Sequence, residues 1–110
     1  MIVVVRVIST ELDSLARRVV KFFKLGKNVH TARQAAPFGF DSNPIPKNMQ
    51  AIFAETSVDG RPVIIGYLNL DQIVSEGESR MYSVDTDGNL KMYVTCKSDG
   101  TLLLLSLIHI

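Results

Sequence analysis

The stretch PFGFDSNPIPKNMQ, residues 37–50, restricts the fold of this chain more than any other part of it. Pro44 and Pro46 fix their own φ angles and move the residues before them out of the α region. Gly39 accepts backbone angles that other residues avoid. A helix or a central strand cannot continue through such a segment. We therefore predict a stiff corner that sends the chain from one strand to the next at a fixed angle.

Strand patterns lie on both sides of this corner. The β-branched residues at 3–8 favour an extended strand, and three later segments read as strands in the same way: 29–36, 49–56 and 63–70. The sequence SVDGRP between the last two predicts a hairpin turn. We expect an antiparallel meander over residues 29–70 with short connections. Gly66, inside one of the strands, favours a small curved barrel over a flat sheet.

The segment between Leu12 and Phe23 carries two conflicting patterns. Its apolar residues recur with helical spacing, Thr10 can serve as an N-cap, and Gly26 can end a helix. The sequence RRVVKFF within it is rich in residues that favour strands. We predict a short helix over residues 10–17 and leave its end open.

The pattern changes after Leu70, where the motif Asp-Gly-x-Leu occurs at 87–90 and again at 99–102. Asp-Gly favours tight hairpin turns. The strand between the two motifs places four apolar residues on one face: Leu90, Met92, Val94 and Cys96. Two short strands cannot bury such a face unaided. We expect it to be covered by the first part of the chain or by other copies of the chain.

Composition argues against several functional classes. The 110 residues are 46% hydrophobic, enough for the core of one modest domain, and the net charge of +1 gives no indication of nucleic-acid or membrane binding. Residues 1–36 contain seven basic and two acidic side chains, which we interpret as a solvated basic face. The stretch RRVVKFFKLGK leaves one alternative open, an OB-fold module that binds single-stranded nucleic acid. The competing interpretation places Phe22 and Phe23 in the core.

The sequence carries no recognisable catalytic or metal-binding motif. The single cysteine, Cys96, has no partner for an internal disulfide, and we expect a buried, inert thiol. His30 and His109 lie far apart, and Glu76 and Glu78 flank a glycine that indicates a turn. We expect neither an enzyme nor a cofactor or metal site. The apolar N-terminal run lacks the basic leader of a signal peptide and is interrupted by Arg6, and it is too short to span a bilayer. We therefore expect a cytoplasm-like compartment.

Four motifs in a fixed order resemble one protein family. They are ARQAAPFGFDSNPIPKNMQAIFAE, GRPVIIGYLN, GESRMYS and DGTL, and the resemblance covers roughly residues 10–105. In this order and at these separations they resemble the Mu-type phage baseplate assembly and tail spike proteins, particularly relatives from phages and prophages of gut bacteria. The family resemblance implies an OB-fold-like antiparallel barrel at residues 1–75. At residues 76–110 it implies a junction and the beginning of a trimeric β-helix or β-prism shaft.

The resemblance also assigns roles to individual residues. It implies a structural corner in the barrel made by Pro37, Phe38, Gly39, Ser42, Asn43 and Pro44. It implies a junction made by Gly77, Glu78, Tyr82 and Ser83. It implies a trimer interface made by Leu90, Met92, Val94, Cys96, Leu102 and Leu104.

The implied role is mechanical. A homotrimeric spike would close the tail tube, contact tube and hub proteins of the baseplate, and puncture the host envelope. It would be assembled in the bacterial cytoplasm and reside in the virion, with no nucleic acid as partner. A hub adaptor that pierces nothing fits the same motifs. The ending LLLLSLIHI departs from the family pattern and resembles translated adapter sequence, so we expect the reading frame to be truncated there.

Overall fold

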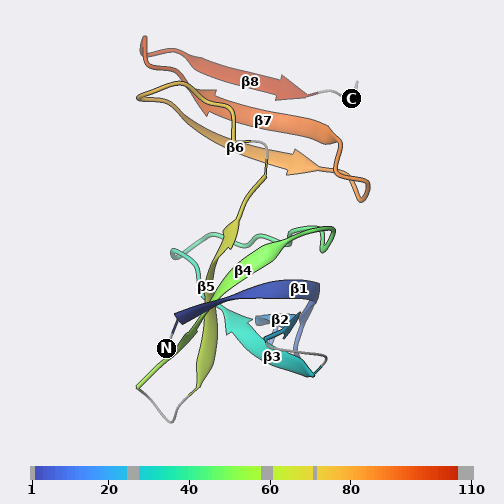
Figure 1. Ribbon diagram of the computed structural model, residues 1–110. Coiled ribbons are helices and arrows are strands. Elements are labelled where there is room, and N and C mark those ends of the chain that lie inside the picture. The colour runs from blue at the N-terminus through green and yellow to red at the C-terminus, as the bar shows by residue number, and fades with distance from the viewer. Residues whose placement is uncertain (1, 25–27, 58–60, 71, 107–110) are drawn as a thin grey trace. The chain divides into compact units, whose positions relative to one another are not determined.

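Eight strands make up the secondary structure that the computed structural model describes, which covers residues 2–24, 28–57, 61–70 and 72–106. The chain divides into two units, Met1–Leu70 and Asp71–Ile110 (Figure 1). The first unit contains β1 (Ile2–Leu12), β2 (Arg18–Phe23), β3 (Val29–Gln34), β4 (Gln50–Glu55) and β5 (Pro62–Leu68). The second contains β6 (Ser79–Val84), β7 (Leu90–Cys96) and β8 (Leu102–Ser106). Within these described ranges, no helix is long and apolar enough to cross a membrane.

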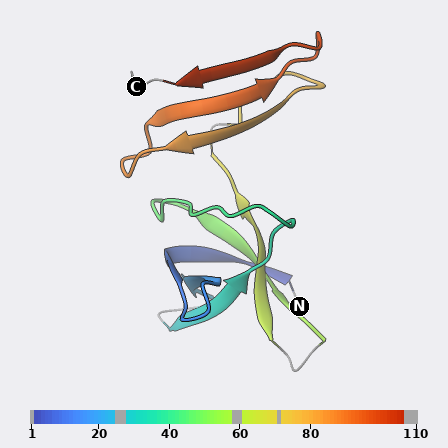
Figure 2. The ribbon, with the colours of Figure 1, turned by 180° about the vertical axis from the view of Figure 1, so that it is seen from behind.

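The first unit is a closed barrel with the strand order β1-β2-β3-β5-β4. The long strand β1 pairs antiparallel with both β2 and β4, which closes the barrel on one side. On the other side β3 and β5 run parallel and pair only at Arg33 with Val63 and at Gln34 with Ile64. Figure 2 shows the barrel from behind, with the segment between β3 and β4 crossing one end of it. The predicted small barrel is thus present.

The barrel differs from the predicted antiparallel meander, because β3 pairs parallel with β5 and not with β4. The strands β3 and β4 do not pair with each other, and the segment that joins them, residues 35–49, is long. The strands β4 and β5 do form an antiparallel pair, as predicted, although residues 58–60 of the SVDGRP turn lie outside the described residues. The β4–β5 register shifts beside Gly66, the glycine that suggested curvature.

The predicted helix over residues 10–17 is wrong. Residues up to Leu12 belong to β1, and Asp13 begins a hairpin turn into β2. The Asp13 carboxylate accepts hydrogen bonds from the backbone N–H groups of Leu15 and Arg17. These bonds stabilise a turn in place of the backbone hydrogen bonds of a helix. In β2 every second residue is buried, namely Val20 and Phe22. This is the alternation of a strand and not the spacing of a helix.

The barrel interior holds the hydrophobic core of the described chain. It consists of Val5, Val7, Val20, Phe22, Ala32, Met49, Ala51, Phe53 and Ile64. These residues alternate with more exposed ones along their strands, as expected for a barrel that is filled by side chains. The Phe22 and Phe53 rings lie 5.4 Å apart and fill the centre together.

The second unit is a three-stranded antiparallel sheet in the order β6-β7-β8, visible as neighbouring arrows in Figure 1. Both Asp-Gly motifs form hairpin turns, and Gly88 and Gly100 adopt positive φ angles of 92° and 89°. The carboxylates of Asp85 and Asp99 accept backbone hydrogen bonds within these turns. The β-helix shaft that the family resemblance implied is not supported, since consecutive strands here form one meander.

Candidate functional site

Residues 35–49 between β3 and β4, here called the corner loop, contain the predicted structural corner. Two turns shape this loop. The Phe40 N–H donates to the carbonyl of Pro37, and Gly39 between them has a φ of 88°, a value typical of position i+2 in a type II turn. The Met49 N–H donates to the carbonyl of Pro46 in the second turn, and the buried Met49 side chain joins the barrel core. Met49 thereby anchors the end of the loop.

Side-chain hydrogen bonds attach the middle of the corner loop to the barrel. The Arg18 guanidinium of β2 donates to both Asp41 oxygens, at 3.1 and 3.0 Å. Asn43 accepts a hydrogen bond from the Thr10 hydroxyl of β1. Because these partners belong to two different strands, the loop is held at several points in a defined position.

A third attachment comes from β3. The Gln34 side-chain amide donates to the Ser42 carbonyl at 3.0 Å, and its oxygen accepts a hydrogen bond from the Tyr67 hydroxyl. Burial raises the pKa of Tyr67 to about 12, so this hydroxyl remains a donor at neutral pH. Sequence reasoning placed Ser42 and Asn43 in the corner. It did not find Arg18, Gln34 or Tyr67, because no spacing in the sequence joins them to it.

The Arg18–Asp41 ion pair should change the pKa of Asp41 measurably. The hydrogen bonds from Arg18 lower the pKa of Asp41 below its ordinary value of 3.8. The pair therefore stabilises the folded chain fully above pH 3.8, and this contribution is lost as the pH falls through the lowered value. Carboxyl NMR should find Asp41 titrating below 3.8 in the native chain. In Arg18→Gln the pKa should rise toward the ordinary value, and an unchanged pKa would contradict the pairing.

The attached corner loop presents aromatic side chains to solvent. Phe38 is fully exposed at the turn, and Phe40 is largely exposed beside it. Exposed single apolar residues are common on protein surfaces. Phe38 and Phe40, however, lie together on a loop that Met49 and Asp41 hold in place. A partner could therefore bind both rings without first ordering the loop. The loop is thus a candidate docking surface.

The second candidate surface is one face of the sheet in the second unit. Cross-strand register places Met81, Val94 and Leu104 in one row and Cys96 beside Leu102 in the next. We call this the apolar sheet face, made up of Met81, Met92, Val94, Cys96, Leu102 and Leu104. Met81, Leu102 and Leu104 are 62%, 68% and 64% exposed. The face thus contains most of the residues predicted to form a trimer interface. Leu90 is the first residue of β7, lies opposite Val84 beyond a register shift, and is half-buried.

The opposite face of the same sheet carries polar and aromatic side chains on β6 and β7, and Leu103 and Leu105 on β8. The Arg80 guanidinium lies over the rings of Tyr82 and Tyr93, 4.6 and 5.7 Å from their centroids. Thr95 on this face is buried. The predicted junction residue Tyr82 therefore stabilises the sheet from this side, whereas Ser83 is exposed on the other side opposite Met92.

The remaining junction residues, Gly77 and Glu78, join two turns of the second unit. The Glu78 carboxylate accepts hydrogen bonds from the backbone N–H groups of Ser98 and Ser75, and Lys97 lies 3.8 Å away. The two backbone hydrogen bonds lower the pKa of Glu78 below its usual value. Gly77 has a φ of 83°, a conformation that side chains rarely adopt. Glu78 therefore links the turn at Ser75 to the turn at Ser98.

Removal of the Glu78 carboxylate should loosen both turns together. In Glu78→Ala we expect the amide hydrogens of Ser75 and Ser98 to exchange on the order of ten times faster, because each loses a charged acceptor. Hydrogen exchange followed by NMR would measure this. Glu76→Ala is the matched control, since it removes an exposed carboxylate two residues away. Equal effects from both substitutions would contradict the assigned role.

The basic and aromatic stretch that suggested nucleic-acid binding is mostly used within the barrel. Phe22 is buried in the core, as the competing interpretation predicted, and Phe23 is half-buried. The basic side chains of this stretch that the structure describes form ion pairs: Arg17 with Asp13, Arg18 with Asp41, Lys21 with Glu11 and Lys24 with Glu55. Lys27 lies outside the described residues. These residues therefore offer no row of rings with free cations beside it.

Reactive groups in the described chain do not converge. Cys96 is exposed on the apolar sheet face, so the predicted burial of its thiol is wrong. His30 is exposed on β3, where it stacks on Phe22, and His109 lies outside the described residues. Among the described residues, no group of three or more His, Cys, Asp or Glu side chains could hold a metal ion.

Comparisons with known proteins do not add to these observations. No family model, curated protein or solved structure matches the chain significantly.

Proposed function

We propose that this chain is a non-enzymatic structural module that forms the base of the central spike in a contractile phage tail. Its barrel would be an OB-fold, a class of five-stranded Greek-key barrel. Its second unit would assemble with two further copies of the chain. The motif order supports the family, and the apolar sheet face is the observation that carries the proposal. Attachment to the baseplate and contact with the host envelope follow from the same resemblance.

The apolar sheet face supports assembly because its exposure is costly. Fully burying one leucine or methionine side chain contributes about 1.5–3 kcal/mol relative to leaving it in water. Met81, Leu102 and Leu104 each remain mostly exposed, and they lie together on one face. Contiguous apolar patches of this kind mark interaction sites. Three copies around an axis would bury all three faces at once, and folding and association would then be linked.

Strand edges support the same arrangement. Among the described residues, β6 and β8 each have one neighbouring strand, so they form the two edges of the sheet. Such edges favour pairing with other chains unless they are covered. Association of three sheets would cover the edges together with the apolar face. A rod without free edges suits a part that has to remain stiff under load.

The corner loop supplies the complementary surface for attachment. Phe38 and Phe40 are exposed aromatic residues on a fixed loop of the barrel. Aromatic side chains dominate the binding energy of many protein interfaces, and a fixed loop reduces the entropy lost on binding. We assign this loop to contact with a tube or hub protein of the baseplate.

The molar mass in solution tests the proposal. Light scattering coupled to gel filtration should give a trimer of three times 12.2 kDa, or 36.6 kDa. A folded, strictly monomeric species across the micromolar range would contradict it. The genomic neighbourhood gives a second test, since sheath, tube and baseplate genes should lie beside this gene. Neighbouring genes without any tail protein would argue against the phage role even if the chain is trimeric.

A further inference from the structure

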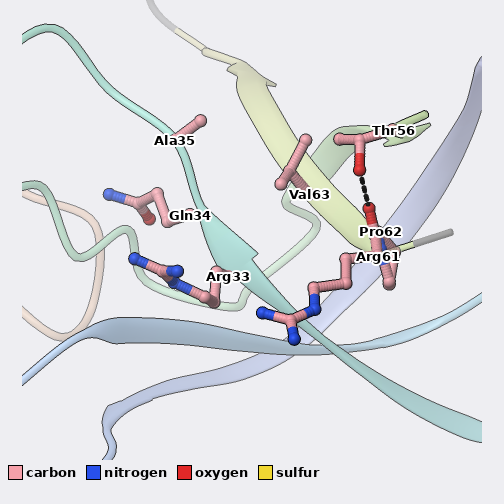
Figure 3. A pocket seen from close by; sticks show the side chains of 7 residues that line it. All are labelled: Arg33, Gln34, Ala35, Thr56, Arg61, Pro62 and Val63. Atoms are coloured by element: carbon pink, nitrogen blue, oxygen red, sulfur yellow. Dashed lines mark hydrogen bonds between the residues drawn. The ribbon is translucent and has the colours of Figure 1, made fainter. Parts of the chain in front are cut away.

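We propose that a pocket on the barrel binds the carboxylate side chains of an extended acidic peptide. The pocket has a volume of about 310 Å³ and lies where β3 ends beside the start of β5. Figure 3 shows the residues that line it: Arg33, Gln34, Ala35, Thr56, Arg61, Pro62 and Val63. The site does not depend on the spike role proposed above, because it uses neither the corner aromatic residues nor the apolar sheet face.

Two arginines give the pocket its charge. Arg33 pairs in register with Val63, and Arg61 precedes Val63 by two residues, so the three side chains share one face of the sheet. Figure 3 shows the Arg33 and Arg61 side chains extending toward the same side. Both arginines are exposed. The ion pairs of the described residues involve neither Arg33 nor Arg61. Four other cations of the barrel do form such pairs, as given above.

Backbone contacts hold both arginines in position. The Thr56 hydroxyl donates to the Arg61 carbonyl at 2.7 Å, and the Thr56 N–H donates to the same oxygen at 3.2 Å. On the other side the Ala35 N–H donates to the Ile64 carbonyl at 2.8 Å, which fixes the chain next to Arg33. Two guanidinium groups on fixed backbone can each donate two parallel hydrogen bonds to a carboxylate.

The edge of β3 indicates an extended ligand. The strand β3 begins at Val29 but pairs with β5 only at Arg33 and Gln34. Residues 29–32 therefore have no strand on the β5 side among the described residues. An exposed edge of this kind accepts a peptide as an additional strand, in which alternate side chains point to one face. Arg33 lies at the end of the open edge and Arg61 beside it, so acidic side chains on that face would reach both.

The lining favours a peptide over a nucleic acid. The apolar part of the pocket consists of Ala35, Pro62 and Val63, and none of the lining residues is aromatic. Single-stranded nucleic acid is held mainly by bases that stack on rings. An acidic peptide instead needs backbone partners, aliphatic contacts and paired cations, all of which this pocket offers. The sequence of the barrel unit, residues 1–70, holds nine basic and five acidic side chains, and this positive surplus would attract such a peptide.

Binding can be tested with a capped, fluorescent hexapeptide that alternates glutamate and valine. Fluorescence anisotropy with the full chain at low salt should show saturable binding. The double variant R33Q/R61Q should weaken it about tenfold or more, because charge-assisted hydrogen bonds are lost. The matched control R6Q/K47Q removes the same charge at two exposed positions outside the pocket and should leave the affinity within about twofold. Thermal melting should show that both variants are folded.

Two further ligands test whether the pocket requires carboxylates and whether it prefers a peptide to a nucleic acid. The same peptide with glutamine for glutamate should bind at least tenfold more weakly. An oligothymidylate of similar length should compete poorly. The proposal is overturned if the chain does not bind the acidic peptide at millimolar concentration. It is also overturned if both double variants lose equal affinity, or if the oligonucleotide displaces the peptide at a lower concentration than unlabelled peptide does. None of these results bears on the trimer mass.

Discussion

Replacement of Phe22 by alanine is expected to destabilise the barrel by about 3–5 kcal/mol. Phe22 has no exposed surface, and its ring lies against that of Phe53 at the centre of the core. Small domains are stable by about 5–15 kcal/mol, so this loss is a large part of the total. Chemical denaturation followed by far-ultraviolet circular dichroism should show the midpoint moving to a markedly lower concentration of denaturant.

Phe38→Ala is the matched control for this experiment. It deletes the same side chain from a residue that is fully exposed on the corner loop, so the free energy of unfolding should change by less than about 0.5 kcal/mol. Similar losses from the two substitutions would show that Phe38 is buried in the molecule as it occurs in solution, or that Phe22 is not. Either result would contradict the arrangement described for the barrel.

Leu104→Lys is expected to convert the proposed trimer into a monomer. Leu104 lies in the middle row of the apolar sheet face, beside Val94. Around a threefold axis the substitution would place three ammonium groups close together in an apolar interface, where an unpaired charge costs several kcal/mol. Light scattering should therefore report 12.2 kDa for the variant. The barrel should remain folded, since no core residue is altered.

The control for this prediction is Ile73→Lys. Ile73 is as exposed as Leu104 but lies in the segment before β6, outside the apolar sheet face. The same charge added there should leave the mass of the assembly unchanged. Dissociation by both variants would indicate a general loss of solubility or fold, and dissociation by neither would exclude this face as the interface.

Local patterns predicted most of the strands correctly. The β-branched run that became β1, the segments that became β3, β4 and β5, and both Asp-Gly hairpins are present. Each of these features depends on residues that are near one another in sequence. The apolar face of β7 was also predictable, because alternation along a strand decides which side chains share a face.

Predictions failed where distant residues or local hydrogen bonds decide the structure. The helical spacing near Leu15 was overridden by the turn at Asp13 and by the alternating burial of Val20 and Phe22. The parallel pairing of β3 with β5 joins segments that are separated in sequence by the corner loop and by β4, and no pattern in either strand indicates it. The exposed Cys96 was predicted to be buried because its residue type usually is.

The same distinction between local patterns and contacts of distant residues applies to the candidate surfaces. Residue types in the corner loop predicted a stiff corner, but only the structure joins Asp41 to Arg18 and Ser42 to Gln34. The pocket had no signal in the sequence. Arg33 and Arg61 are ordinary surface residues until the parallel pairing of β3 and β5 brings them to one face.

The closure of the barrel through β1 and β4 has a consequence for biosynthesis. As the chain leaves the ribosome, β1 can form its hairpin with β2 almost at once, because the two strands are adjacent in sequence. The other edge of β1 pairs with β4 and therefore stays unpaired until residues 50–55 have been translated. During that interval a valine-rich edge is exposed to neighbouring nascent chains. Slow translation of the segment before Gln50 would lengthen this vulnerable period, and rapid translation would shorten it.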